Sequence, residues 1–500
     1  MKKGRLFLKN IIWGLLALVF LIGGLTLFWF LANIRSPVQT NEDYISSETC
    51  GYCHYDHYAT WVETAHAKAF QVVSAESNPI IPAWEGTLTF SEGDIHDVQI
   101  RLEETDEGFP LAILVDSADP SIEKEFLVTR ISGGHGWKQR FYTYIEGDYY
   151  MLPMDWNQSI DNWTPLSLQF WWREDGSLRD KPPTLVSWSS MCAGCHETGL
   201  VVTYGFTGYQ EYESTEAYIG CEKCHGPGQA HLNNPGPDTI INPSKLTFEK
   251  ELEACGQCHS YGNSVPLPLS RYPIKIFGGE TYRVGENLDD YRKNKPILWE
   301  GTEFSKKHRQ QYTDHLLSGH NSAEIGCSAC HSPHGTEHEH DLLAASDNRE
   351  LCLSCHADDS QSELAYKFED TAAIDDHTQH PIDLMDGEEI ACTSCHQQDA
   401  TYSAALGDGT SHHFTIVSPQ VSLDMFNSFK DRDPVPDLWS DGIVGHNSLQ
   451  EYLSLEIIPN SCNECHTEWK DSQDGYQAGV EAFLEMFPDF EIAITTPDSQ

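Results

Sequence analysis

The longest apolar stretch of the chain lies near its N-terminal end. Residues 11–32 (IIWGLLALVFLIGGLTLFWFLA) contain no charged residue. As a helix rising about 1.5 Å per residue, they would extend roughly 33 Å, enough to cross the hydrocarbon core of a bilayer. Four basic residues precede this stretch and one closely follows it: Lys2, Lys3, Arg5, Lys9 and Arg35. The positive-inside rule then predicts a cytoplasmic segment over 1–10, an uncleaved transmembrane anchor over 11–32 and a linker over 33–46.

Residues 86–155 show the two-residue alternation of half-buried strands. Val98, Ile100 and Leu102 alternate with polar residues, and the segments 140–145 and 149–152 flank Glu146-Gly147-Asp148. Glycine at a tight turn between two such segments is typical of a β-hairpin. The pattern predicts a small β subdomain here. Five tryptophans that lie in or after it are expected to pack in a core or against a prosthetic group: Trp156, Trp163, Trp171, Trp172 and Trp188.

The remaining chain predicts short helices joined by Gly/Pro-rich loops such as Gly226-Pro227-Gly228. Near the end, Val480, Phe483, Leu484 and Phe487 recur at helical spacing, and Pro488 stops the pattern. The expected fold is therefore mainly α with long loops, with one small β subdomain and one N-terminal transmembrane helix.

Composition adds a strong acidic bias. The 500 residues include 76 Asp and Glu against 31 Lys and Arg, a formal charge of −45. Such a surface repels nucleic acid, so a nucleic-acid partner is excluded. The same field favours basic proteins or cations, although a well-solvated surface explains it equally well.

The cysteines carry the chemistry. All 16 fall into eight C-x-x-C pairs, each followed at once by histidine, and we number these motifs 1 to 8 in chain order. The pairs are Cys50/Cys53, Cys192/Cys195, Cys221/Cys224, Cys255/Cys258, Cys327/Cys330, Cys352/Cys355, Cys392/Cys395 and Cys462/Cys465. Their histidines are His54, His196, His225, His259, His331, His356, His396 and His466.

Two thiols about one helical turn apart can add to the two vinyl groups of a porphyrin, and the next residue then lies beneath the iron. C-x-x-C-H is the attachment signal of haem c, with the histidine as proximal axial ligand. Zinc sites and disulfides also use paired cysteines, but neither requires the histidine. The sequence therefore predicts eight covalently bound haems, in a compartment outside the cytoplasm.

The motif spacing suggests two tetrahaem modules. Motifs 1 to 4 fall within 47–270, which contains the β subdomain at about 86–155, and motifs 5 to 8 fall within 271–470. A C-terminal helix and tail follow over 471–500. Sixteen histidines lie outside the motifs while only seven methionines occur, so most irons are expected to be bis-histidine and of low potential.

Several motif segments resemble the tetrahaem cytochromes of hydroxylamine oxidation and their longer octahaem relatives with a doubled C-x-x-C-H module. The matching segments are CGYCHYDHYATWVETAHAKAF, MCAGCHETG, CEKCHGPGQAH, ACGQCHS, LLSGHNSAEIGCSACHSPHG, HTQHPIDLMDGEEIACTSCH and SHHFTIVSP. The resemblance covers roughly residues 47–470 and implies seven distal axial ligands: His66, His231, His320, His334, His377, His380 and His412.

The resemblance leaves one haem without a second ligand. His135, His315 and His446 are the reserves, and His413 is the rival of His412. We expect five other histidines to be solvated residues without a ligand role: His57, His96, His308, His338 and His340.

The function expected from these features is electron transfer between redox partner proteins by a cytochrome in the inner membrane, with its haems on the periplasmic side. The alternative is a multihaem oxidoreductase acting on nitrite, hydroxylamine or tetrathionate at one five-coordinate haem. Direct quinol oxidation and a scaffolding role in a respiratory complex are weaker hypotheses.

Overall fold

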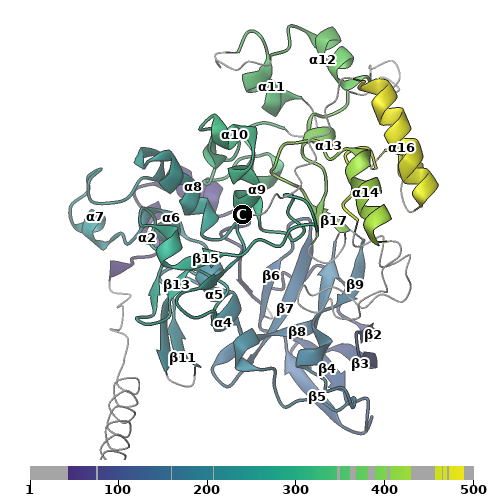
Figure 1. Cartoon of the computed structure of the whole chain (residues 1–500). Coiled ribbons are helices and arrows are strands. Elements are labelled where there is room, and N and C mark those ends of the chain that lie inside the picture. Colours follow the sequence, from purple (N-terminus) through teal and green to yellow (C-terminus); the bar gives the residue numbers. More distant parts are fainter. Residues whose placement is uncertain are drawn as a thin grey trace, which may run out of the picture.

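The computed structural model describes residues 43–488, apart from 75–76, 159, 206–207, 346–348, 361–366, 381–388, 403–405, 430–456, 464 and 470–471. Figure 1 shows a β-rich part at the bottom of the view and short helices with long loops above and beside it. The chain enters the β-rich part directly after motif 1 and leaves it before motif 2.

The first sheet of this part has the order β2-β3-β4-β5 and is antiparallel throughout. Its strands are β2 Gly86–Glu92, β3 Ile95–Glu104, β4 Pro110–Val115 and β5 Glu123–Leu127. In β3 the apolar residues Val98, Ile100 and Leu102 are buried and the intervening residues face outwards, as their alternation predicts.

The second sheet has the order β1-β6-β7-β8-β9 and is also antiparallel. Its strands are β1 Gln71–Val72, β6 Arg130–Gly133, β7 Lys138–Ile145, β8 Asp148–Asn157 and β9 Asn162–Pro165. β7 and β8 form the predicted hairpin, in which Ile145 pairs with Asp148. The two turn residues, Glu146 and Gly147, have φ of 49° and 95°, the left-handed pair that a two-residue type I′ turn requires.

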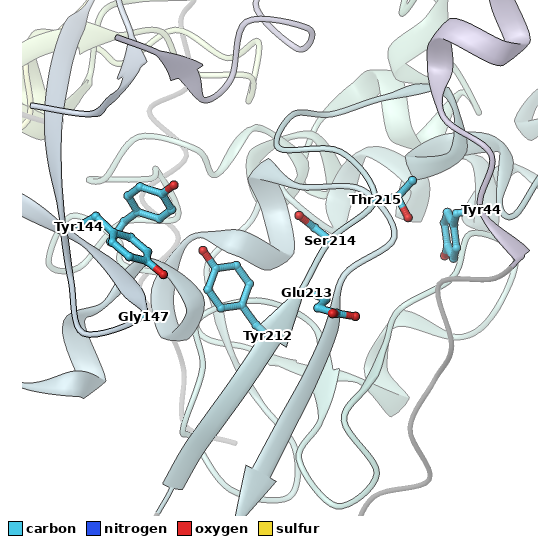
Figure 2. Close-up of a pocket in the computed structure, with 8 residues that line it drawn as sticks. Tyr44, Tyr144, Gly147, Tyr212, Glu213, Ser214 and Thr215 are labelled. Atoms are coloured by element: carbon cyan, nitrogen blue, oxygen red, sulfur yellow. The ribbon is translucent and has the colours of Figure 1, made fainter. Parts of the chain in front are cut away.

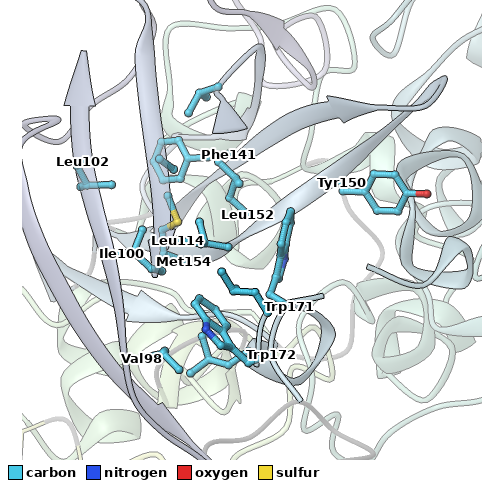
Figure 3. Packing of buried hydrophobic residues seen from close by; sticks show 14 of the residues in the cluster. Val98, Ile100, Leu102, Leu114, Phe141, Tyr150, Leu152, Met154, Trp171 and Trp172 are labelled. Carbon is cyan, nitrogen blue, oxygen red and sulfur yellow. The ribbon is translucent and has the colours of Figure 1, made fainter. Parts of the chain in front are cut away.

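The two sheets enclose one hydrophobic core (Figure 3). Leu114 from the first sheet and Leu152 from the second are both fully buried. Trp171 donates to the carbonyl of Met151 at 2.9 Å and Trp172 to that of Val115 at 3.0 Å, so each indole also satisfies its polar atom. Trp156 and Trp163 pack against the same core, as predicted for these tryptophans.

Short helices cover much of the remaining chain, and most motifs lie on or beside one. The α-helices are α2 Ser47–Gly51, α3 Tyr55–Trp61, α4 Trp188–Met191, α5 Ala193–His196, α6 Cys221–His225, α7 Gln229–Asn233, α8 Phe248–Gly256, α9 Gln311–Leu316, α10 Gly319–Ser322, α11 Glu350–His356, α12 Thr371–Thr378, α13 Thr393–His396, α14 Pro419–Phe429 and α16 Gln473–Met486. The 3-10 turns are η2 Leu168–Phe170, η3 Thr184–Val186, η4 Pro243–Lys245, η5 Leu288–Asp290, η6 Cys327–Ala329, η7 Glu339–Asp341 and η10 Thr467–Trp469.

Small two-stranded sheets complete the described structure. They pair β10 Val201–Gly205 with β11 Gly208–Glu213, β12 Gly262–Ser264 with β15 Arg292–Asn294, β13 Ile274–Lys275 with β14 Glu280–Thr281, and β16 Thr401–Tyr402 with β17 Leu406–Gly409. The predicted C-terminal helix is confirmed as α16, whose Tyr476 and Val480 share a core with Leu423 and Met425 of α14.

The predicted fold class is wrong in two respects. Strands are too numerous for a mainly α protein, because the segment between motifs 1 and 2 forms two sheets and further hairpins follow motifs 2, 4 and 7. The part of the chain that the structure describes also contains no helix long and apolar enough to cross a bilayer. The segments 1–10, 11–32 and 33–42, on which the anchor prediction rested, lie outside the described residues.

The core between the two sheets makes a prediction for stability. Leu152→Ala removes a fully buried side chain and is expected to lower the free energy of unfolding by about 2–5 kcal/mol. The matched control is Leu127→Ala on β5, where the side chain is 43% exposed and a change within about 0.5 kcal/mol is expected. Urea unfolding followed by circular dichroism compares the two variants, and equal losses would contradict the assignment of the core.

Candidate haem-binding centres

Each motif places its cysteines and histidine within one tight turn. In motif 1 the amide of His54 donates to the carbonyl of Cys50 at 2.9 Å, and the corresponding distances in motifs 2 and 4 are 3.1 and 3.0 Å. No two of the 16 cysteines are joined in a disulfide. The thiols are therefore available for thioether bonds to porphyrin vinyl groups.

The motif thiols differ in how far the protein covers them. Cys195 is buried, whereas Cys53, Cys255, Cys355 and Cys465 are exposed. Residues that bind a cofactor are ordinarily enclosed, so the exposure of Cys53 and Cys465 differs from what their predicted haem-binding role suggests. The physical reason is that a thioether lies at the rim of the porphyrin, while the axial histidines hold the iron at its centre. An exposed thiol can therefore still anchor a haem whose rim faces solvent.

Seven of the eight motif histidines face a second histidine at nearly the same ring-centre distance. The pairs are His54–His231 at 6.3 Å, His66–His259 at 6.3 Å, His225–His334 at 6.1 Å, His320–His356 at 6.4 Å, His331–His412 at 6.3 Å, His377–His396 at 6.0 Å and His380–His466 at 6.3 Å. In each pair, the histidine that does not belong to a motif is one of the seven distal candidates from the sequence.

This spacing fits one iron between two imidazoles. An imidazole nitrogen binds a metal at about 2.0 Å and lies about 1.1 Å from its ring centre, so two rings on opposite sides of one iron have centres about 6.2 Å apart. Directly stacked aromatic rings lie closer, as Phe70 and Trp188 do at 3.6 Å. The gaps between the paired histidines thus have the width that a bis-histidine haem requires.

Hydrogen bonds orient several of these rings. The Nδ1 atoms of His225, His331 and His396 lie 2.7, 3.0 and 3.4 Å from the carbonyl oxygens of Ile241, His340 and Phe414. A carbonyl bound at Nδ1 fixes the tautomer and leaves Nε2 to bind a metal.

Burial keeps two of the facing imidazoles neutral. Burial, together with the positive charges of neighbouring groups, lowers the pKa of His259 to about 4 and that of His412 to about 3. The neutral form is the one that ligates iron.

Motif 2 differs from the other seven. The nearest aromatic ring to His196 that the structure records is Trp188, at 5.4 Å, and no second histidine in the described residues faces it at a ligand distance. Of the three reserve histidines, His135 and His315 pair with no motif histidine, and His446 lies outside the described residues. The ring of His413, the rival of His412, packs against the ring of Phe304, with ring centres 4.7 Å apart.

Contacts between cysteines show which motifs are neighbours. In four pairs of thiols from different motifs, each thiol is the strongest influence on the pKa of the other: Cys50 and Cys221, Cys195 and Cys258, Cys255 and Cys327, and Cys352 and Cys392. Five further pairs lie close enough to interact electrostatically: Cys224 and Cys255, Cys224 and Cys258, Cys330 and Cys352, Cys330 and Cys355, and Cys395 and Cys462. These contacts connect the motifs in the order 1-3-4-5-6-7-8, with motif 2 as a side branch on motif 4.

One cavity lies apart from the motif histidines. It has a volume of about 630 Å³, and its lining includes Tyr44, Tyr144, Tyr149 and Tyr212 (Figure 2). No motif histidine lines this cavity.

Sequence reasoning missed a group of basic residues around motif 2. His308, which was expected to be a solvated residue, has a buried Nδ1 atom, so this prediction is wrong. The sequence feature that could have indicated this basic group is the run Lys306-Lys307-His308-Arg309 in an otherwise acidic chain. Runs of charge usually lie on the surface, whereas here Lys306 and Lys307 are each only 5% exposed.

Comparisons with known proteins agree with this geometry. The family "Cytochrome c554 and c-prime" matches residues 49–84 and 175–226, and the family "Doubled CXXCH motif" matches residues 320–361. The multihaem cytochrome MtrA of Shewanella baltica (strain OS185) is 31% identical over 181 residues, which are 33% of this chain and 52% of that protein. The chain thus spans about half the length of this curated relative.

Among solved structures, the outer cell wall cytochrome OcwA has a similar fold. The TM-score is 0.56 at 19% identity, over 89% of this chain and 87% of that one. Together, the eight motifs, the family matches and this fold identify the chain as a multihaem c-type cytochrome with covalently bound haem. A relation to the cytochromes of hydroxylamine oxidation in particular does not follow from these matches.

The predicted location is also corrected. A single-pass protein of the inner membrane is contradicted by the lack of any spanning helix in the described part of the chain. The solved structure with the similar fold is a cytochrome of the outer cell wall.

The contact between motifs 1 and 3 yields a testable prediction. The buried carboxylate of Glu222 accepts hydrogen bonds from the amides of Ile45, Ser46 and Gly228 at 2.7–3.0 Å, and so joins the two motifs. Glu222→Ala is expected to lower stability by about 3 kcal/mol, since each buried donor left unsatisfied costs about 1–3 kcal/mol. Limited proteolysis should then cleave near Ser46 more rapidly. Glu104→Ala, at an exposed strand end, is the control, and equal cleavage rates would contradict the role of Glu222.

Proposed function

We propose that the chain is an octahaem cytochrome that relays electrons outside the cytoplasm. The observation that supports this most directly is the set of seven histidine pairs with ring centres 6.0–6.4 Å apart, each containing a motif histidine. Covalent haem supplies one-electron chemistry, while the protein supplies attachment, axial ligands and spacing.

The proposed ligand assignment follows the pairs. The proposed second axial ligand is His231 for the haem of motif 1, His334 for motif 3, His66 for motif 4, His412 for motif 5, His320 for motif 6, His377 for motif 7 and His380 for motif 8. With imidazole on both sides of the iron, these seven centres are expected to have lower reduction potentials than centres ligated by methionine and histidine.

The proposed route for electrons runs from motif 1 to motif 8 through motifs 3, 4, 5, 6 and 7. It follows the pairs of neighbouring thiols, since motifs whose cysteines lie near each other also hold their porphyrin edges close together. The contact of Cys255 with Cys327 crosses from the proposed module 47–270 to the module 271–470. The two modules then form one conduit rather than two separate ones.

Both ends of this proposed route carry an exposed thiol. Cys53 belongs to motif 1 and Cys465 to motif 8, and both are exposed. A porphyrin attached at such a thiol presents its rim to solvent, where a redox partner can approach it. Cys255 of motif 4 and Cys355 of motif 6 are exposed as well, so the thiols allow a partner to approach both ends of the proposed route without singling out those two haems.

The location and partners are proposed from the class and the relatives. Covalent haem attachment, together with the outer cell wall cytochrome of similar fold, supports a position outside the cytoplasm. Redox proteins are the expected donor and acceptor, and the formal charge of −45 favours partners with basic docking surfaces.

The ligand assignment is tested at His66. His66→Ala is expected to convert one of eight irons from low spin to high spin, because the haem of motif 4 loses its second imidazole. His66→Met should restore low spin and raise the potential of that centre. Electron paramagnetic resonance and a redox titration of the oxidised full-length protein measure both effects.

The matched control is His96→Ala, since His96 is exposed on β3 and distant in sequence from any motif. It should leave all spin states unchanged. A mass lower than eight haems per chain in the unmodified protein, or no spectral change in His66→Ala, would refute the assignment.

A further inference from the structure

The histidine of motif 8 contacts two rings at different distances. His466 faces His380 with ring centres 6.3 Å apart, the spacing of a bis-histidine centre. Its other neighbour is Trp469, whose ring centre lies only 4.0 Å away, and the two planes differ by 6°. The indole thus stacks flat on the imidazole, in a gap too narrow for an iron. The contact with Trp469 is therefore packing, whereas the contact with His380 leaves room for the metal.

This stack is specific to motif 8 within the residues that the structure describes. His196 of motif 2 also lies beside an indole, that of Trp188, but at 5.4 Å and with planes 57° apart. The six other motif histidines have a distal candidate as the aromatic contact that the structure records. A parallel indole at van der Waals distance is thus a feature of one haem-binding motif.

Trp469 connects this imidazole with the C-terminal helix. It is the last residue of η10, and its amide donates to the carbonyl of His466 at 3.0 Å. On α16, Gly479 is buried against the indole side chain. A Cβ added at Gly479 would lie 3.0 Å from the Cβ of Trp469 and 3.3 Å from its Cγ. The missing side chain of this glycine therefore allows α16 to approach the tryptophan closely.

α16 is itself fixed to the segment that leads into motif 8. Its Tyr476 and Val480 share a hydrophobic core with Ile457 and Ile458, which precede the motif. Ser422 of α14 donates to the carbonyl of Ile458 at 2.8 Å and joins the same unit. The residues before motif 8 and the helix after it thus form one packed unit, and this unit sets the position of Trp469.

The two imidazole planes at motif 8 are turned relative to one another. The planes of His380 and His466 differ by 55°, whereas those of His225 and His334 differ by 6°. Because each ligand plane contains its bond to the iron, this angle is a rotation about the axis through the iron. In low-spin ferric haem the splitting of the iron d orbitals depends on this rotation, and so do the largest g value and the reduction potential. A group that fixes the rotation of an axial ligand therefore tunes the centre.

We propose that Trp469 is a positioning residue for the haem of motif 8, because it holds the imidazole of His466 turned away from the plane of His380. This inference rests on the proposed ligand assignment and deepens the proposed function, since motif 8 is one end of the proposed electron route. The C-terminal helix, through Gly479 and Trp469, then adjusts the potential of a terminal haem.

A second group near the imidazole is the carboxylate of Glu468, which lies 3.7 Å from the Nδ1 atom of His466. This distance exceeds that of a hydrogen bond. The side chain of Glu468 is also 67% exposed, so solvent screens its charge. The indole, in contrast, covers one face of the ring. We therefore assign the orientation of His466 to Trp469 rather than to Glu468.

The test is electron paramagnetic resonance of the oxidised, full-length, haem-loaded protein. His380→Ala first identifies the motif 8 signal, because it removes that centre from the low-spin spectrum. Trp469→Ala is expected to shift the largest g value of this signal towards those of centres with near-parallel ligand planes, since the released imidazole turns towards the plane of its partner. A redox titration should show a lower potential for one haem, because water that replaces the indole favours the ferric state.

Three variants control this result. Trp469→Phe should restore both values, since a flat ring can still stack on the imidazole. Gly479→Ala should move the same signal by a smaller amount, because the added methyl group displaces the indole although alanine favours a helix more than glycine does. Trp137→Ala is the matched control, since this indole lies between β6 and β7 and is 41% exposed. It should leave the motif 8 signal unchanged.

Other outcomes separate this inference from the proposed function. An unchanged signal in Trp469→Ala, or a failure of Trp469→Phe to restore it, would overturn the inference. The same shift in Glu468→Gln would assign the orientation to the carboxylate, again against the inference. If no low-spin signal responds to His380→Ala, the ligand assignment of the proposed function is refuted, and this inference is refuted with it.

Discussion

The separation of two imidazole rings by the width of one iron is the constraint on which most of this structure depends. The facing histidines come from segments far apart in sequence, such as His54 with His231 and His225 with His334. Outside the β-rich part and the core shared by α14 and α16, the helices are short, and isolated helices of this length are not stable in water. The paired histidines, rather than helix packing, therefore hold much of the chain in place.

The sequence was informative where the chemistry is local and much less so where it is long-range. The motif cysteines and histidines are adjacent in sequence, so haem attachment could be predicted residue by residue. The seven additional histidines that the structure brings opposite motif histidines were also identified, from a resemblance between short segments. Which motif each one faces could not be predicted: His66 follows motif 1 in sequence but faces His259 of motif 4. The exposure of Cys53 and Cys465 could not be predicted either. The motif indicates that a haem is attached, but it does not indicate which neighbouring residues cover the thiols.

The two main errors have physical causes. The hairpin β7–β8 could be predicted because glycine at a tight turn is a local signal, whereas the pairing of β1 with β6 joins segments separated by the whole first sheet. The extent of β structure was therefore underestimated. The basic run at Lys306-Lys307-His308-Arg309 has the composition of a solvated surface, and only its position between β7 and motif 2 accounts for its burial.

The interlaced pairing of ligands has a consequence for how the protein matures. If translocation delivers the chain from its N-terminal end, the proposed ligand set of motif 1 is complete only after residue 231 has emerged, and that of motif 3 only after residue 334. The proposed ligand set of motif 5 is complete only after His412 has emerged. The ligand sets of motifs 6 and 7 are complete earlier, after residues 356 and 396. At motifs 1, 3 and 5, thioether bonds can therefore form before the proposed second histidine has emerged, whereas at motifs 4, 6, 7 and 8 the proposed second histidine emerges before the motif itself.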